Sequence, residues 1–400
     1  MALIVQKFGG TSVGSIERIE AVSDLIIKTQ QQGHKVVVVV SAMSGETNRL
    51  FNLATQIDEA PSARELDVLL STGEQVSIAL LAMAIIKRGY SAVSLLAEQI
   101  AIKTDNMFGR ARVEYIDTER LKQELEHNRI AIVAGFQGRD VEGNVTTLGR
   151  GGTDTTAVEI AGAIQADECQ IYTDVDGVYT ADPRLVEQAK RLPQIRFEEM
   201  LELASLGAKV LHLRSVEAAG RYKLPLRVLS SFTPDEGTLI SFKETPMSDN
   251  PVTGIATNKD VVFYQFSTSE AKIFAQFLSE LAKSQIEVDM LHQLSRQVDI
   301  LSYAFTVQSN DHLAVLALLQ SEPFAHSINE VVFELNMAKI SLVGLGVQSQ
   351  PEVLAKSLTV LADKQVTPKL MSTAQIKVSI LVTETQLHSV INQLHVTFLP

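Results

Sequence analysis

The chain has 400 residues, of which 46% are hydrophobic and 20% charged, and its net charge is -12. A chain of this length and ordinary composition is expected to form two or three domains. An acidic balance without a basic stripe argues against a nucleic-acid partner. The single cysteine, Cys169, excludes a disulfide framework within the chain and suits the cytoplasm.

Neither a membrane span nor a secretion signal is expected. The most apolar run, Ile78 to Ile86, stops at Lys87 and Arg88 and is shorter than a span requires. The first residues lack the charged and apolar regions of a signal peptide. We therefore expect a cytoplasmic enzyme or sensor with no membrane partner.

Short β-branched runs alternate with segments of helical periodicity over the first part of the chain. This alternation predicts an α/β fold in three αβα layers, with a mainly parallel central sheet and ligands bound at the carboxyl ends of its strands. The expected elements are strand Leu3–Val5, helix Ile16–Gln32, strand Val36–Val40, helix Gly73–Arg88, strand Ser91–Leu96, helix Thr118–His127, strand Ile130–Ala134, helix Thr155–Ala163 and strand Cys169–Thr173.

A change of composition and an internal repeat mark the second part. Residues 233–252 are rich in Pro, Asp, Glu and Ser and predict the exit from the first domain, with a short strand at Thr238–Phe242. The related segments "FLSELAKSQIEVDML" and "SLTVLADKQVTPKLM" begin at Phe277 and Ser357. Each lies between strand-like runs, which predicts a duplicated α+β unit. A packing or dimerisation role and ligand binding both remain open. The runs are Val261–Phe266, Ile300–Val307, Ile340–Val343 and Ile376–Thr383.

The segment "VQKFGGTSVGS" places Lys7 before Gly9, Gly10 and Ser12, between a predicted strand and a helix. Glycines let successive backbone N–H groups approach an anion, and the helix N-terminus favours negative charge. A lysine beside such a nest can neutralise a phosphoryl group during transfer. The alternative is a plain β-turn with an exposed lysine, and this stretch alone favours the turn.

Further polar residues follow the next strands. Ser41 and Thr47 belong to a hydroxyl-rich loop that could hold a carboxylate or an amine, or cap a helix. Glu74 begins a predicted helix, where capping is the simpler interpretation. In "TLGRGGTDTTA", Arg150 can bind a carboxylate in bidentate fashion, and Asp154 can hold an ammonium group. Pairing of Arg150 with Asp154 is the structural alternative.

The segment "YTDVDGVYTADPR" clusters aspartates but lacks the spacing and the glutamate of a calcium loop. Thr173, Asp174, Tyr179 and Arg184 could instead surround a nucleotide. The sequence has no GxxxxGK[ST], HExxH or CxxC motif, and its histidines form no ligand-spaced cluster. We therefore expect no protein-bound zinc and no P-loop.

Four segments occur in the order typical of the aspartate kinases, a branch of the amino acid kinase superfamily that carries a C-terminal pair of ACT domains. The segments are "KFGGTSV", "TTLGRGGTDTTA", "YTDVDGVYTADPR" and "FEEMLELASLGAKVLHLRSVEAA". The resemblance covers nearly the whole chain and is densest from Lys7 to Ser231. It implies a kinase domain at 1–240, a first ACT domain at 250–325, completed by C-terminal residues, and a second at 326–400.

This resemblance implies phosphoryl transfer from ATP to the side-chain carboxylate of L-aspartate, in the pathway to lysine, threonine and methionine. Lys7 and Asp154 would be catalytic, and magnesium would bridge the phosphates without a protein metal site. A homodimer through the ACT domains is also implied. The implied ATP-binding residues are Lys7, Gly9, Gly10, Ser12, Thr173, Asp174, Tyr179, Arg184 and Lys209. The implied aspartate-binding residues are Ser41, Thr47, Glu74, Arg150, Gly151 and Asp154.

The chain departs from the family in its ACT effector loops, which usually read Asp-x-Pro-Gly. The first copy has neither the proline nor the glycine over residues 269–272, and the second keeps Pro351 but has Glu352 in place of glycine. Glu287 and Pro368 replace the usual asparagine. A side chain and a charge at the glycine position would oppose a ligand carboxylate. We expect weakened feedback control, which sub-millimolar inhibition by lysine or threonine would contradict.

Two other functions remain open at this point. Another amino acid kinase relative would phosphorylate a different carboxylate or a phosphate, and Arg150, Asp154 and the ACT pair argue against it. A catalytically inactive amino-acid sensor would not need Lys7, Glu74, Arg150 and Asp154 together.

Overall fold

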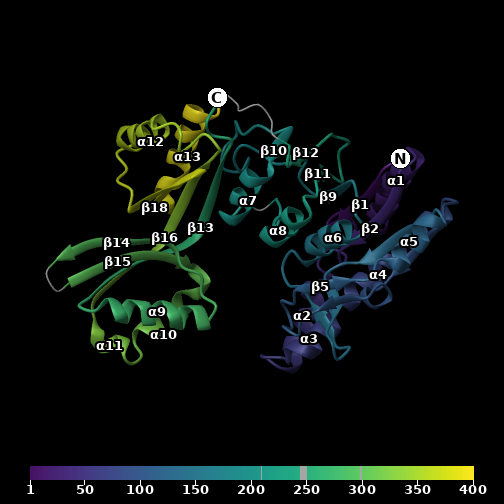
Figure 1. The fold of residues 1–400 in the computed structure, drawn as a ribbon, viewed down its shortest axis with the longest axis horizontal. Helices are drawn as coiled ribbons and strands as arrows, with labels where there is room; N and C mark the ends of the chain where they lie inside the picture. Colours follow the sequence, from purple (N-terminus) through teal and green to yellow (C-terminus); the bar gives the residue numbers. More distant parts are fainter. Residues whose placement is uncertain (209, 244–249, 298–299) are drawn as a thin grey trace. The chain divides into compact units, whose positions relative to one another are not determined.

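The computed structural model describes residues 1–208, 210–243, 250–297 and 300–400 (Figure 1). They form two compact units. The first unit comprises Met1–Val178, Arg191–Ser205 and Lys209–Thr245, and the second comprises Tyr179–Lys190, Leu206–Ala208 and Pro246–Pro400. Two short segments from the first part of the chain therefore belong with the C-terminal unit. The domain boundaries expected from the sequence stay predictions.

The first unit is built on an eight-stranded sheet in the order β10-β12-β11-β9-β1-β2-β6-β3. Its strands pair in parallel except for β12, which runs antiparallel to β11. The strands are β1 (Leu3–Phe8), β2 (Lys35–Val40), β3 (Ala92–Leu95), β6 (Ile130–Ala134), β9 (Glu168–Thr173), β10 (Gln194–Arg196), β11 (Leu226–Ser230) and β12 (Thr238–Ser241).

Helices cover both faces of this sheet and confirm the predicted three-layer fold. On one face, α1 (Ile16–Gln31) and α4 (Thr72–Lys87) pack on Val36, Val38 and Val40 of β2. The alternate valines of β2 point to the opposite face, where α6 and α5 contact the sheet. The other helices of this unit are α2 (Glu46–Ile57), α3 (Ala63–Leu70), α5 (Glu119–Glu126), α6 (Gly152–Ala163), α7 (Phe197–Ser205) and α8 (Leu213–Tyr222).

The elements predicted up to Thr173 are all present, with ends shifted by at most three residues. A second sheet of four short strands, in the order β5-β4-β7-β8, was not predicted. Three of its strands have three residues each, too few to show an alternating pattern. Its last strand, β8, leads directly into the loop at residues 148–151. The strands are β4 (Ile102–Thr104), β5 (Val113–Ile116), β7 (Gln137–Arg139) and β8 (Val145–Thr147).

One helical stretch bears on the expectation that the chain has no membrane span. Among the described residues, the helical stretch Ala63–Lys87 is long and apolar enough to cross a membrane by length and composition, although no such run was expected. Half of its most apolar window is buried inside the protein. Ile78, Leu81 and Ile85 of α4 belong to the core under the central sheet. A core helix passes the same test of composition, so this stretch is weak evidence for a membrane span.

The second unit contains one antiparallel sheet in the order β14-β15-β13-β16-β18-β17. Its strands are β13 (Gly254–Thr268), β14 (Asp289–Gln297), β15 (Ile300–Gln308), β16 (Ile328–Val343), β17 (Leu370–Ala374) and β18 (Lys377–Thr383). Its helices are α9 (Ala271–Lys283), α10 (His312–Leu319), α11 (Phe324–Ser327), α12 (Glu352–Asp363) and α13 (Glu384–Phe398).

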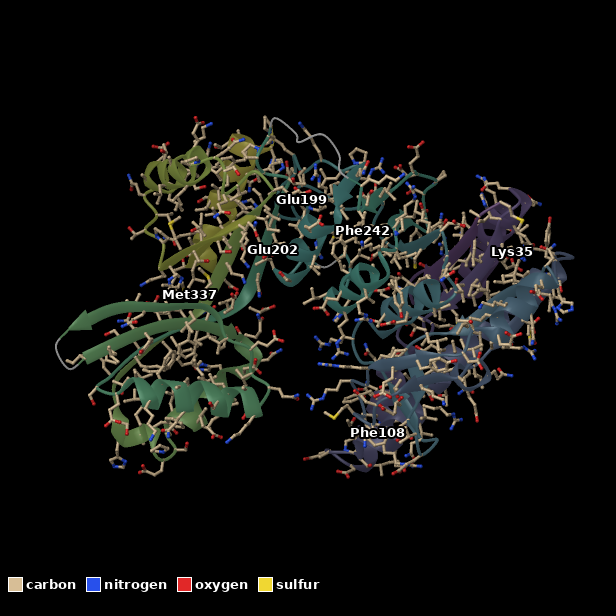
Figure 2. The ribbon with its side chains drawn as sticks, viewed as in Figure 1. Lys35, Phe108, Glu199, Glu202, Phe242 and Met337 are labelled. Carbon is tan, nitrogen blue, oxygen red and sulfur yellow. The ribbon has the colours of Figure 1, made fainter. Side chains whose placement is uncertain are left out.

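The two repeats of this unit share β13 and β16, which are much longer than the sequence predicted. These strands pair with each other along most of their length, with register shifts near Asn258 and Val261. Met337, labelled in Figure 2, is fully buried at the point of β16 where pairing with β18 begins. The duplicated units therefore form one continuous sheet.

Each repeat keeps its own hydrophobic core. Phe277 of α9 and Phe305 of β15 belong to the core of the first repeat. Val360 of α12 and Leu394 of α13 belong to the core of the second. Within this unit, α9, α10 and α11 gather at one end of the sheet, and α12 and α13 at the other (Figure 1).

Candidate functional site

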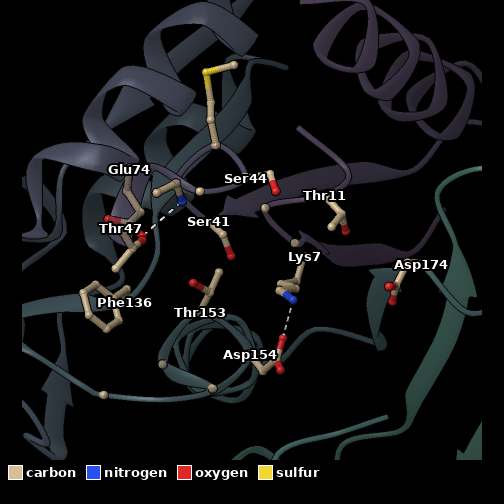
Figure 3. Close-up of a pocket in the computed structure, with 18 residues that line it drawn as sticks. Lys7, Thr11, Ser41, Ser44, Thr47, Glu74, Phe136, Thr153, Asp154 and Asp174 are labelled. Carbon is tan, nitrogen blue, oxygen red and sulfur yellow. Dashed lines mark hydrogen bonds and ion pairs between the residues drawn. The ribbon is translucent and has the colours of Figure 1, made fainter. Parts of the chain in front are cut away.

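A pocket of about 530 Å³ opens in the first unit, next to the carboxyl ends of β1 and β2. Figure 3 shows its main side chains. The pocket is lined by Lys7, Gly9, Gly10, Thr11, Ser41, Ala42, Met43, Ser44, Gly45, Thr47, Glu74, Phe136, Gly149, Gly151, Gly152, Thr153, Asp154 and Asp174.

The loops after β1 and β2 meet because these neighbouring strands are parallel and end at the same edge. A Cβ atom on Gly10 would lie 2.9 Å from the carbonyl oxygen of Ala42. Only glycine therefore allows this close approach of the two backbones. The side-chain nitrogen of Lys7 lies 3.3 Å from the place of a Cβ on Gly9, so it sits directly beside the glycine loop.

Lys7 and Asp154 form an ion pair at the centre of the pocket, with 2.6 Å between Nζ and Oδ1 (Figure 3). Lys7 lies on β1 and is only 8% exposed. Asp154 lies in the first turn of α6, where the helix dipole favours a negative charge. Because little water reaches the two charges, their attraction is strengthened, and the ion pair holds the lysine nitrogen in place.

Glu74 supplies a second buried carboxylate to the pocket. It lies in the first turn of α4, is 3% exposed and accepts a hydrogen bond of 3.1 Å from the backbone N–H of Ala42. Burial raises the pKa of Glu74 to about 7, against the lowering effect of that hydrogen bond. No donor among the described residues reaches its buried Oε2 atom. A buried acceptor without a partner favours a ligand that brings a donor.

The pocket has two ends on either side of Lys7. Glu74, Thr47 and Phe136 lie on one side, and Asp174 lies on the other (Figure 3). Asp174 follows β9, is exposed and accepts a 3.0 Å hydrogen bond from the hydroxyl of Thr173. A small amino acid and a polyphosphate could therefore approach Lys7 from opposite sides.

A glycine-rich turn closes the pocket before α6. Gly149 and Gly151 have φ values of +75° and +68°, in the region that favours glycine. A Cβ on Gly151 would lie 2.2 Å from the ring of His212. Burial lowers the pKa of His212, because the charged imidazolium is poorly solvated there.

The structure brings most of the predicted site residues of this unit together. Those that line the pocket are Lys7, Gly9, Gly10, Ser41, Thr47, Glu74, Gly151, Asp154 and Asp174. Ser12, Thr173 and Arg150 are not among the lining residues. The Ser12 hydroxyl is buried 2.8 Å from that of Ser231, and Arg150 is exposed. The binding roles of these three residues stay predictions.

The other residues predicted to bind the nucleotide lie outside the first unit or outside the described residues. Tyr179 and Arg184 belong to the second compact unit, where Arg184 forms a 2.7 Å ion pair with Asp182. Lys209 lies outside the described residues.

Half of the lining residues were not predicted individually. Most are glycines or small side chains next to predicted ones, so proximity in sequence was the available signal. Phe136 had no such signal. It follows β6 and has a φ of +71°, which the sequence does not predict. The lining residues missed are Thr11, Ala42, Met43, Ser44, Gly45, Phe136, Gly149, Gly152 and Thr153.

Within the described ranges, no group of three or more His, Cys, Asp and Glu side chains is arranged to hold a metal ion. Asp174 is the exposed carboxylate at the end of the pocket opposite Glu74. Magnesium commonly binds through one or two carboxylates together with substrate phosphates. The residues present therefore fit a magnesium ion that arrives with a nucleotide.

The first prediction concerns Gly151. Replacing it with alanine introduces a Cβ against His212 at a positive φ, and should lower the aspartate-dependent ADP release expected from the family resemblance by at least about tenfold. Gly143→Ala is the matched control, because its φ is +84° and no atom lies within 4 Å of the added Cβ. Equal activities of the two variants in steady-state assays would contradict the packing argument.

Comparison with known proteins identifies the family. The profile of the amino acid kinase family matches residues 2–230, and an ACT domain profile matches residues 340–398. The chain is 49% identical to an aspartate kinase of Stutzerimonas stutzeri, over 100% of the chain and 97% of that protein. It is also 49% identical to an aspartokinase of Pseudomonas aeruginosa, over 100% and 98%.

Solved structures agree with this result. The fold is similar to that of Escherichia coli aspartokinase III in complex with aspartate and ADP, with a TM-score of 0.83, 26% identity and full coverage of both chains. The TM-score to the same enzyme with lysine and aspartate is 0.77, also at 26% identity and full coverage. The chain therefore belongs to the aspartate kinases of the amino acid kinase family.

Proposed function

We propose that the pocket around Lys7 carries out the aspartate kinase reaction of this family. The γ-phosphoryl group of ATP passes to the β-carboxylate of L-aspartate and gives 4-phospho-L-aspartate, the first step towards lysine, threonine and methionine. The observation that carries the proposal is the ion pair between buried Lys7 and partly buried Asp154, flanked by a Glu74 oxygen that has no donor among the described residues. The E. coli enzyme of similar fold binds aspartate and ADP.

The chemistry needs charge neutralisation more than proton transfer. A carboxylate oxygen of aspartate attacks the γ-phosphorus, the bond from phosphorus to the bridging oxygen breaks, and ADP leaves with that electron pair. The nucleophile is already ionised near pH 7, so no general base is required. Lys7 faces the transferred phosphoryl group and offsets its charge, while Asp154 holds the lysine nitrogen in position.

The substrate amino acid occupies the end of the pocket that contains Glu74. Its ammonium group can donate to the free Oε2 of Glu74 and approach Asp154. Ser41 and Thr47 offer hydroxyl groups at the same end. Arg150 binds the α-carboxylate in this proposal, which requires its exposed side chain to turn towards the substrate.

The nucleotide occupies the other end, beside Gly9, Gly10 and Asp174. Magnesium would be held by the phosphates and Asp174, where it supplies positive charge to the phosphate oxygens. Ser12, Thr173, Tyr179, Arg184 and Lys209 remain the proposed further nucleotide residues. Cys169 is a buried free thiol, which suits a reducing compartment and supports a cytoplasmic location.

The second prediction tests the role of Lys7. Lys7→Ala removes the cation that faces the phosphoryl group and should lower kcat for aspartate-dependent ADP release by at least about 100-fold. Lys28→Ala on the exposed side of α1 is the matched control and should retain full activity. Near-native turnover of Lys7→Ala in a coupled assay would contradict the assignment. Glutamate, tested as an acceptor in the same assay, distinguishes aspartate from another small acid.

The third prediction concerns the pH dependence that Glu74 imposes. With its pKa near 7, ionised Glu74 should become available to the substrate ammonium as the pH rises through 7, so kcat/KM for aspartate should rise over that range. Glu74→Gln keeps an acceptor for Ala42 but loses the charge, and should flatten this rise while lowering kcat/KM. An unchanged pH profile in Glu74→Gln would refute the role.

The same group gives an independent thermal readout. Its folded-state pKa lies above the ordinary value of 4.5, so the folded state holds the proton more tightly. The resulting stabilisation is complete below pH 4.5 and is lost as the pH rises towards 7. Glu74→Gln should therefore raise Tm, relative to the native chain, more at pH 8 than at pH 5.

The ACT unit supports a homodimer as the working form. β18 pairs only with Met337–Val343 of β16, and no described strand pairs with residues 328–336 on that edge. An open strand edge is a template for pairing with another chain. The side chains near this edge are apolar and exposed, which favours a second copy of this chain as the partner. They are Val331, Val332, Phe333 and Leu335.

The fourth prediction follows from this edge. Leu335→Lys places a charge on a side chain that is 48% exposed at the edge, and should convert the dimer into a monomer of 43.7 kDa in light-scattering measurements. Leu313→Lys on α10, which is 77% exposed and away from the edge, should leave the mass unchanged. A native chain that is already monomeric, or a Leu335→Lys variant that remains dimeric, would rule out this interface.

A further inference from the structure

Asp67 is a buried carboxylate that the proposed mechanism does not use. It lies on α3, is 1% exposed and accepts hydrogen bonds from two segments far away in the sequence. The backbone N–H of Gly109 lies 3.1 and 2.9 Å from its two oxygens. The backbone N–H and the hydroxyl of Thr147 donate to it at 2.8 and 2.7 Å.

These partners lie immediately beside the glycine turn of the pocket. Thr147 is the last residue of β8 and precedes the turn that contains Gly149 and Gly151. The carbonyl oxygen of Gly109 lies 2.8 Å from the place of a Cβ on Gly149, so the two backbones are in close contact. Asp67 thus binds both Gly109, against which the turn packs, and Thr147, from which the turn begins.

The chemistry of Asp67 favours a role in orientation. Among the described residues, no Lys or Arg forms an ion pair with Asp67. Directional hydrogen bonds therefore hold its carboxylate in place. Burial raises its pKa, while the bonds from Thr147 and Gly109 lower it. Moving any one donor away from such a buried carboxylate is costly, because the carboxylate then lacks a hydrogen-bond partner in the protein interior.

We propose that Asp67 is a positioning residue for the amino-acid end of the pocket. By holding Gly109 and Thr147 together, it sets the course of residues 148–151 and hence the placement of Gly149, Arg150 and Gly151 towards the substrate. This inference rests on the proposed function, because it assigns the turn to aspartate binding. The nucleotide end, at Gly9 and Asp174, has no contact with Asp67 among the described hydrogen bonds.

Steady-state kinetics of Asp67→Ala, Asp67→Asn and Glu65→Ala test the proposal. Asp67→Ala should raise KM for aspartate by about tenfold or more and leave KM for ATP within about twofold, since displacement of a positioning group acts on the substrate that it orients. Asp67→Asn retains an oxygen for the backbone donors and should recover most of the loss. Glu65→Ala, an exposed carboxylate of the same helix, is the control.

A purely structural role predicts a different result. It would lower Tm of Asp67→Ala without changing either KM of the folded fraction, and that outcome overturns the positioning role. If Asp67→Ala does not fold, Thr147→Val removes only the hydroxyl bond and should raise KM for aspartate alone, whereas equal effects on both KM values would overturn the proposal. A native chain without aspartate-dependent ADP release would reject the proposed function and this inference together, while an active native chain isolates the test of Asp67.

Discussion

The ion pair between Lys7 and Asp154 is the interaction on which the site depends, because it joins the first strand of the central sheet to the first turn of α6. Lys7 alone, at the end of a strand, would be a mobile cation near a glycine loop. Asp154 fixes its nitrogen within a pocket where little water competes for either charge. The glycines of the first loop then provide backbone groups beside a cation of fixed position, as phosphoryl transfer requires.

The sheet explains how such distant residues meet. Parallel pairing of β1 with β2 and β9 places the loops that carry Gly9, Ser41 and Asp174 along one edge. The helices α4 and α6 bring Glu74 and Asp154 to the same place through their first turns, where their dipoles favour carboxylates. The small four-stranded sheet then directs residues 148–151 over the pocket.

Much of this arrangement could be predicted from the sequence, and the rest could not, for physical reasons. A run of valines indicates β2, and the resemblance to the aspartate kinases implies the roles of Lys7 and Asp154, which the stretches around them do not establish alone. Phe136 and Asp67 carried no such signal, since one depends on an unusual backbone angle and the other on partners distant in sequence. The full length of the shared strands β13 and β16 was also missed, because only Val261–Phe266 and Ile340–Val343 within them were predicted. The polar residues near Asn258 interrupt the alternation, and the chain continues through them with a register shift.

The ACT unit bears on regulation through the residues that begin its helices. Glu352 is the first residue of α12 and pairs with Lys356 at 3.3 Å, so its charge occupies the helix N-terminus where an effector carboxylate would otherwise be favoured. The weakened feedback expected from the sequence stays a prediction. The segment Tyr179–Lys190 belongs to the same unit. Within it, the hydroxyl of Thr180 lies 2.9 Å from the Nε2 atom of His395 on α13. A segment expected to contact nucleotide is thus held by the C-terminal helix.

Trapping of the product tests the central claim most directly. An acyl phosphate on the β-carboxylate of aspartate reacts with hydroxylamine to give the β-hydroxamate, which mass spectrometry distinguishes from the α-hydroxamate. The account predicts β-hydroxamate that requires both ATP and aspartate and that disappears when Asp154 is replaced by asparagine. Formation of the α-hydroxamate, or an undiminished yield in Asp154→Asn, would contradict it.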